Sequence, residues 1–324
     1  MAHRRLTAFT ATGGFRLCGV VARRRERAKA LADAFGGAPV FDDHRSLAGV
    51  APRAVLLEVP HNVQDEIAAW VVEQGWHLLV GGPLATTESA GRALAAAAAR
   101  RNVVVEAGFE ARYKPVWETA KTLVATGVLG RLVAVDAVAL WAADPARWYY
   151  DETLSGGMPL THMTYCFINP LRWLLGEPSE VAAMGNQLMR RTADAVREET
   201  CIALLRFPGD VVASLTAGYV RSADAGSWQV RLFGSAATLE ILPDEMGPGR
   251  LRVLRGESAQ EHHFPPEEDG FRRQAQAFLD AIGGAATCRN RPPDCVGDLR
   301  VADAIRRSAR DRTMVACYSS DPRS

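Results

Sequence analysis

The sequence lacks the features that mark several classes of protein. No run in its 324 residues approaches about 18 consecutive apolar side chains, which argues against a membrane-spanning helix and a membrane partner. Its 38 Lys and Arg side chains are balanced by 37 Asp and Glu, so it has no basic excess for binding nucleic acid. Its six cysteines form no Cys-x-x-Cys pair, which predicts reduced, mostly buried thiols in a cytoplasmic protein and no metal site.

The first third of the chain alternates short apolar runs with helical patterns. Hydrophobic residues make up 48% of the chain, and its length is typical of two globular domains. Near-continuous apolar strands separated by helices predict a parallel sheet with helices on both faces. The expected strands are residues 15–21, 54–59, 77–80 and 103–106, and the expected helices are 25–35, 63–74 and 87–100.

The pattern changes after Pro115. Consecutive strands with no helices between them are typical of an antiparallel sheet. We therefore predict a Rossmann-like domain over residues 1–115 and a second, open-sheet domain over 116–324, with the C-terminal helices packing back. The expected strands are 131–141, 180–187, 199–206, 210–219, 228–233, 236–241 and 251–255, and the expected helices are 115–126, 160–175, 271–282 and 298–310.

Several segments, in this order and spacing, resemble the Gfo/Idh/MocA oxidoreductases. They are Pro60, Gly75-Trp76-His77-Leu78-Leu79-Val80-Gly81-Gly82-Pro83-Leu84, Arg112-Tyr113-Lys114-Pro115, Gly127-Val128-Leu129-Gly130, and Gly156-Gly157 followed by Leu171-Arg172-Trp173-Leu174-Leu175-Gly176. The resemblance implies a nucleotide-binding Rossmann domain joined to a large open sheet through which subunits assemble as homo- or hetero-oligomers. It also implies NAD- or NADP-linked chemistry at a hydroxyl or carbonyl carbon of a sugar-like or polyol substrate.

The beginning of the chain departs from the family pattern. The family opens with a strand and a Gly-x-Gly-x-x-Gly turn that receives the pyrophosphate. Here residues 3–6 resemble the helix that follows this turn, and residues 15–21 resemble the second strand. The expected sheet therefore lacks its first, central strand and exposes an unpaired edge. Either the natural start lies upstream of Met1, or the dinucleotide cradle is lost.

Two arginines follow the expected strand 15–21, where an acidic residue would bind the ribose of NAD. Arg23 and Arg24 carry no charge that repels a 2′-phosphate, so NADP is favoured if a dinucleotide binds; a solvated helix start explains them equally well. The resemblance places further cofactor contacts at Pro60, Gly82, Pro83 and Arg112.

The family's reactive residues are altered. Its Glu-Lys-Pro motif, whose lysine lies beside the nicotinamide, corresponds to Gly81-Gly82-Pro83, and Lys114 is expected to be a solvated helix start rather than a replacement. The family's Asp-His-Asp positions correspond to His162, Cys166 and Asn169, which fall within an arc of about 60° on an α-helix. His162, Tyr165 and Asn169 are predicted as a rearranged acid/base group, with Cys166 lining the substrate site or filling the core.

Aromatic residues precede Gly156 and predict a substrate-facing wall. Trp148 and Tyr149 can cover the apolar carbons of a sugar ring, although contact with a neighbouring subunit explains them as well. Three functions stay open: an NADP-linked oxidoreductase, an inactive homologue that acts as a scaffold or partner subunit, and a lyase or epimerase that uses His162 and Tyr165 without redox chemistry.

Overall fold

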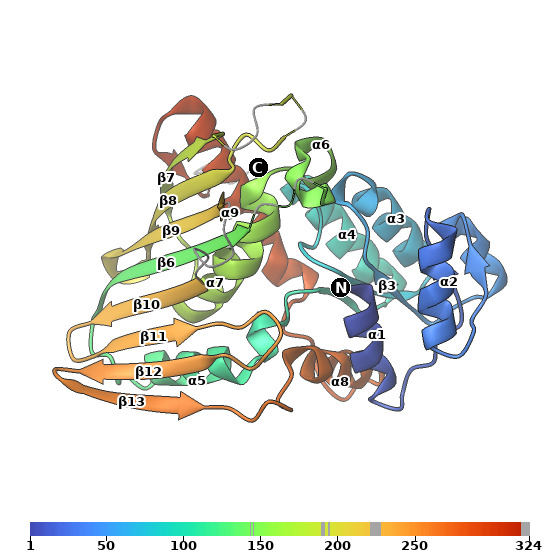
Figure 1. Ribbon diagram of the computed structural model, residues 1–324, viewed down its shortest axis with the longest axis horizontal. Helices are drawn as coiled ribbons and strands as arrows, with labels where there is room; N and C mark the ends of the chain where they lie inside the picture. The colour runs from blue at the N-terminus through green and yellow to red at the C-terminus, as the bar shows by residue number, and fades with distance from the viewer. Residues whose placement is uncertain (143, 145, 189–191, 194, 221–227, 319–324) are drawn as a thin grey trace.

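The computed structural model describes residues 1–142, 144, 146–188, 192–193, 195–220 and 228–318 as two joined domains (Figure 1). The N-terminal domain alternates short parallel strands with helices, as predicted. Its elements are α1 (Ala2–Thr10), β1 (Val20–Val21), α2 (Arg25–Ala34), β2 (Val40–Phe41), the 3₁₀ turn η1 (His44–Gly49), β3 (Ala54–Leu57), α3 (His61–Glu73), β4 (His77–Val80), α4 (Glu88–Arg101) and β5 (Val105–Ala107).

The helix boundaries follow from capping groups in the sequence. Thr87 precedes α4, and its hydroxyl accepts a hydrogen bond from the Ala90 backbone N–H at 3.2 Å. Asn102 ends the same helix in the left-handed conformation, with φ of 51°. Local side-chain chemistry therefore determines where this helix begins and ends.

The parallel strands form two separate sheets instead of one. Strands β1 and β2 pair with each other, while β3, β4 and β5 form a second sheet, so the facing edges of β1 and β3 are unpaired among the described residues. An apolar groove of about 330 Å³ runs between them and includes Leu17, Val20 and Leu56 in its lining. The expected strand over residues 15–21 is reduced to Val20 and Val21. The prediction that a central strand is missing from these residues is confirmed.

The second domain is built on a nine-stranded sheet, and the predicted fold class is confirmed. Its order is β13-β12-β11-β10-β6-β9-β8-β7-β14, antiparallel throughout except for the parallel pair β6 and β9. Its strands are β6 (Leu132–Ala142), β7 (Glu180–Asn186), β8 (Thr200–Phe207), β9 (Val211–Val220), β10 (Trp228–Gly234), β11 (Thr238–Leu242), β12 (Arg250–Arg255), β13 (Ser258–His263) and β14 (Val315–Ala316). Strand β13 was not predicted because its side chains are almost all polar and exposed, so no apolar alternation marks it.

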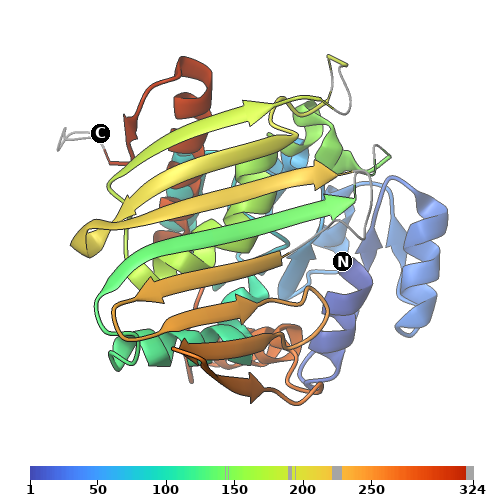
Figure 2. The same ribbon diagram turned by 60° about the vertical axis from the view of Figure 1, so that its left-hand side comes forward.

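Helices cover one face of this sheet, while its other face is turned toward the viewer in Figure 2. The covering layer includes α5 (Pro115–Ala125), α7 (Asn169–Leu175) and α9 (Pro292–Asp311), and α9 also packs against α4 of the first domain. Helix α8 (Gly270–Ile282) lies against α1. The two C-terminal helices α8 and α9 therefore contact helices of the first domain. Within the described ranges, no helix has the length and apolarity needed to cross a membrane.

The expected α-helix over residues 160–175 is wrong in its first half. Residues Pro159–Ile168 form a π-helix, η4, and only Asn169–Leu175 are α-helical, with Pro170 in the first turn of α7. A π-helix bonds residue i to i+5 and rotates side chains away from α-helical positions. The predicted common arc of His162, Cys166 and Asn169 therefore does not exist.

The groove between β1 and β3 makes the fold sensitive to an added strand. Arg5 of α1 bonds to Glu58 just after β3, so a strand parallel to β3 can turn directly into α1. We expect an apolar five-residue strand and a glycine-containing turn, appended before Met1, to raise Tm by roughly 5 °C by burying two or three side chains. Differential scanning calorimetry measures the shift. An appended segment of equal length with alternating Asp and Lys is the control, and an equal rise with both would contradict strand insertion.

Candidate functional site

The loop after β4 brings the backbone of two glycines close to charged and aromatic side chains. Gly82 has φ of +139°, and a Cβ built there lies 3.6 Å from Nε2 of His61. Gly81 is packed against the Glu58 carboxylate so closely that a Cβ would meet it at 2.3 Å. The position of the family's lysine therefore has no side chain and faces an imidazole.

His61 is a candidate site residue that the sequence analysis did not identify. It is the first residue of α3, directly after Pro60, and is 4% exposed. Its Nδ1 lies 2.7 Å from the Ser155 carbonyl oxygen, which can only accept, so Nδ1 carries the proton and Nε2 keeps its lone pair. Burial lowers the pKa of His61 from 6.5 to about 4, so the ring is neutral at pH 7. The sequence offered one indication of a site at His61, because this residue follows a predicted parallel strand and ligands bind at the carboxyl ends of such strands.

His162 lies near His61 on η4 and is half-buried among aromatic rings. Its Nε2 is 2.7 Å from the Tyr219 hydroxyl, and its ring stacks on Trp141 at 4.4 Å. Tyr149 meets the His162 ring edge-on at 5.2 Å, and Trp148 meets His61 at 4.9 Å. Burial, and then the neighbouring His61, lowers the pKa of His162 to about 4. We call His61, His162, Trp141, Trp148, Tyr149 and Tyr219 the histidine cluster.

Tyr165 does not join His162 as predicted. Its hydroxyl donates to Oε1 of Glu110 at 2.5 Å, whereas His162 bonds to Tyr219. Burial, together with Glu110, raises the pKa of Tyr165 well above its usual range. The π-helical geometry of η4 separates the two side chains, so the structure does not assemble the predicted acid/base group.

Lys114 is buried, and the expectation of a solvated helix start is wrong. Its side chain is 3% exposed and its Nζ lies 3.5 Å from Oε1 of Glu110. The ammonium also donates to the carbonyl oxygens of Asp244 at 2.5 Å and Glu245 at 3.2 Å. These contacts hold the amine in place and pair its charge.

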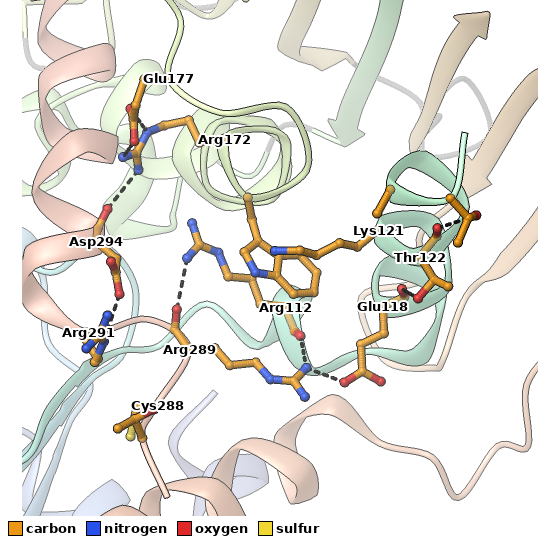
Figure 3. A pocket seen from close by; sticks show the side chains of 14 residues that line it. Arg112, Glu118, Lys121, Thr122, Arg172, Glu177, Cys288, Arg289, Arg291 and Asp294 are labelled. Atoms are coloured by element: carbon orange, nitrogen blue, oxygen red, sulfur yellow. Dashed lines mark hydrogen bonds and ion pairs between the residues drawn. The ribbon is translucent and has the colours of Figure 1, made fainter. Parts of the chain in front are cut away.

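Three other predicted site residues lie outside the histidine cluster. Cys166 is fully buried, and its surroundings raise the pKa of its thiol well above the usual value. Asn169 is also fully buried, and its amide donates to Asp298 at 2.8 Å. Arg112 points into a separate pocket, where it donates to the carbonyl oxygens of Arg289 and Asn169 (Figure 3). Cys166 and Asn169 are positioned by burial, and Arg112 is positioned by its bonds to two carbonyl oxygens, so a shared helix face does not bring the three together.

Metal-ligating side chains do not gather in the described part of the chain. No group of three His, Cys, Asp or Glu residues there is arranged to hold an ion. All six cysteines are free; five are buried and Cys18 is half-buried, as predicted.

A nicotinamide dinucleotide fits the residues present at three points. Gly82 leaves room beside His61, and Pro83, which is buried, accepts a hydrogen bond from Gln64 at its carbonyl oxygen. Helix α1 has no side-chain cap, so its first backbone N–H groups are available to an anion at the carboxyl edge of β3. Arg23 and Arg24 are exposed between β1 and α2.

The depressed pKa values of the two histidines predict a pH-dependent stability. The unfolded chain binds these protons below about pH 6.5 and the folded protein binds them only near pH 4, so the free energy of unfolding falls as pH drops from 6.5 to 4. Each shift corresponds to roughly 3 kcal/mol. Urea unfolding of wild type and of His61→Gln/His162→Gln at several pH values measures this. The double variant should show a shallower slope and His263→Gln an unchanged one; equal slopes in all three would contradict the assignment.

Comparisons with known proteins assign both domains of the chain to one family of oxidoreductases. Residues 1–109 match the family described as "Oxidoreductase family, NAD-binding Rossmann fold", and residues 117–240 match the "GFO/IDH/MocA C-terminal domain". Levoglucosan dehydrogenase of Pseudarthrobacter phenanthrenivorans is 29% identical over 133 residues, which are 40% of this chain and 34% of that enzyme, about a third of its length. Inositol 2-dehydrogenase 2 of Saccharopolyspora erythraea is 26% identical over 85% of this chain and 80% of its own.

A solved structure shares the fold over almost the whole chain. The complex of levoglucosan dehydrogenase with NADH and levoglucosan superposes with a TM-score of 0.85, covering 98% of this chain and 97% of its own at 20% identity. At that identity the likeness establishes the fold alone. The two family matches, which cover residues 1–109 and 117–240, show that this chain is a member of the Gfo/Idh/MocA family of oxidoreductases.

Proposed function

We propose that this protein is an oxidoreductase for a sugar-like or polyol substrate, in which His61 replaces the family's lysine as the group that exchanges the substrate's proton. The geometry at position 82 carries the proposal. Nε2 of His61 faces the space that a side chain at Gly82 would fill, and Nδ1 is committed to Ser155. The remaining lone pair is therefore directed to where the family's amine would act.

The aromatic rings of the histidine cluster support a ring-shaped, hydroxyl-rich substrate. Trp141, Tyr149 and Tyr219 surround His162 and offer faces for apolar ring carbons, while Nε2 of His162 and the Tyr219 hydroxyl offer hydrogen bonds. Relatives with levoglucosan and inositol in their names support the same substrate class.

The proposed chemistry places a proton on His61. A bound NAD(P)⁺ would supply the acceptor for the hydride that leaves the carbinol carbon. The hydroxyl proton of the same substrate then passes to Nε2 of His61, and the carbon–oxygen bond becomes a carbonyl. Burial lowers the pKa of His61 to about 4, so the imidazole is neutral at pH 7 and Nε2 has a lone pair free to accept the proton. The bond from Nδ1 to Ser155 orients the ring and stabilises the imidazolium that forms.

Activity assays test the role of His61. Wild-type protein is incubated with NAD⁺ or NADP⁺ and a panel of cyclitols and anhydrosugars, and the reduced cofactor is followed by absorbance. His61→Gln should lower kcat by about 10²–10⁴-fold, the usual contribution of a general base, while leaving cofactor affinity unchanged.

Two controls accompany this assay. His44→Gln removes a histidine of η1 and should keep wild-type kcat, and circular dichroism verifies that each variant is folded. Full activity in His61→Gln would overturn the role of His61. Binding of NADH and NADPH to the wild type is measured by fluorescence titration. If neither cofactor binds, the proposed oxidoreductase function is overturned.

The two exposed arginines support NADP as the cofactor. Neither Arg23 nor Arg24 forms an ion pair with a carboxylate in the described part of the chain, whereas Arg25 pairs with Asp42 at 3.2 Å. We expect Arg23→Gln/Arg24→Gln to weaken NADPH binding by roughly tenfold or more, since a charge-assisted hydrogen bond to phosphate contributes about 1.5–3 kcal/mol, and to leave NADH binding unchanged. Fluorescence titration measures both constants. A parallel loss for the two cofactors would contradict recognition of the 2′-phosphate.

A second candidate is a non-catalytic homologue that completes an active partner. The absence of an amine at Gly82 and the groove between β1 and β3 favour it. It predicts no turnover in the assay above but a stable complex with a catalytically complete relative.

A further inference from the structure

A second pocket is lined in part by the turn η2 (Glu110–Tyr113) and shares no residue with the histidine cluster. Glu110 contacts Tyr165 and Lys114, whereas Arg112, two residues along, points into a cavity of about 880 Å³ (Figure 3). Helices α5 and α7 and the segment ahead of α9 supply the remaining walls. The cavity is large enough for a small metabolite, and the proposed function does not use it.

Lys121 projects into this cavity from α5 without a carboxylate partner in the described residues. Its ammonium lies 4.1 Å from the centroid of the Trp173 ring, which orients the amine but does not neutralise it. Burial, and then the charges of Arg112 and Arg289, lowers the pKa of Lys121. Lys121, Arg112 and Arg289 line the same pocket, and the two arginines are close enough to disfavour the charged form of the lysine.

Arg112 is the deepest of these cations. Its side chain is buried, with 4% exposure of the residue, and it forms no ion pair with a carboxylate in the described ranges. Its two terminal nitrogens donate to the carbonyl oxygens of Arg289 at 3.0 Å and Asn169 at 2.9 Å, and its Nε has no acceptor among the residues that the structure describes. Carbonyl oxygens are neutral acceptors, so these hydrogen bonds supply no negative charge to balance the guanidinium.

The carboxylates of the pocket do not balance its cations. Arg289 pairs with Glu118, but the same carboxylate also pairs with Arg273 at 2.6 Å. The other lining carboxylates are engaged locally, Glu177 with Arg172 and Asp294 with Arg291. Five cationic side chains and three carboxylates line the cavity, which leaves an excess of positive charge around Lys121, Arg112 and Arg289.

We propose that this pocket binds a phosphate-bearing small molecule at a site separate from the histidine cluster. Guanidinium groups and an ammonium on rigid supports are the donors typical of phosphate recognition. The anion would neutralise the excess charge, and Trp173 offers an aromatic face to the rest of the molecule. A polar, charged lining of this kind is unsuited to an apolar ligand.

Lysine footprinting tests the proposal with pyrophosphate as the probe. The sequence contains three lysines, Lys29, Lys114 and Lys121, so mass spectrometry reports each one separately. Pyrophosphate at millimolar concentration should slow acetylation of Lys121 by acetic anhydride severalfold. Lys29, exposed on α2 and paired with Asp33, is the internal control and should react at an unchanged rate.

Calorimetric titration of matched variants completes the test. Lys121→Met keeps the stem against Trp173 and removes the charge, and should weaken pyrophosphate binding by roughly tenfold or more, while Lys29→Met should leave it unchanged. Arg23→Gln/Arg24→Gln should also leave it unchanged, which separates this site from the proposed cofactor site. Absence of binding, or equal affinity in wild type and Lys121→Met, would overturn the proposal without affecting the assignment of His61.

Discussion

The N-terminal domain depends on one buried arginine. Arg5 is 3% exposed, and its guanidinium joins α1 to the ends of two strands and to α8. It pairs with Glu58 at 2.5 Å and donates to the Gly108 carbonyl oxygen at 2.5 Å and to Gln274 at 2.9 Å. Because no described strand lies between β1 and β3, these bonds hold α1 against the sheet where a continuous backbone ladder is lacking. A buried charge with several partners is costly to disrupt, so this contact fixes the carboxyl edge near His61.

Periodicity and turn chemistry were sufficient to predict most of the fold. Thr87, Pro60 and Pro115 stand at element boundaries in the structure as they do in the sequence pattern, and the switch from parallel to mostly antiparallel pairing follows the loss of helices between strands. The failures have physical reasons. Strand β13 is held by backbone pairing with β12 and buries no apolar face, and the π-helix η4 carries no distinctive residue pattern. Both are determined by neighbouring segments, which a single sequence does not reveal.

The candidate site was only partly predictable for the same reason. The sequence correctly marked position 82 as lacking an amine, and Trp148 and Tyr149 lie against the two histidines. It did not identify His61, because the role of this ring depends on the Ser155 carbonyl, which is 94 residues away in the chain. The tautomer of an imidazole, and therefore which nitrogen can accept a proton, is fixed by such distant partners. No local motif encodes it.

The distribution of the three lysines explains why an imidazole is left for the proton transfer that we propose. Lys29 is on the surface of α2, Lys114 is committed to Glu110 and two backbone carbonyls, and Lys121 lies in the second pocket. An ammonium is a proton donor at pH 7, whereas a neutral imidazole with its Nδ1–H engaged is an acceptor. In this proposal, the neutral imidazole of His61 accepts the hydroxyl proton during alcohol oxidation, and the imidazolium returns it during carbonyl reduction, so one ring serves both directions of the same reaction.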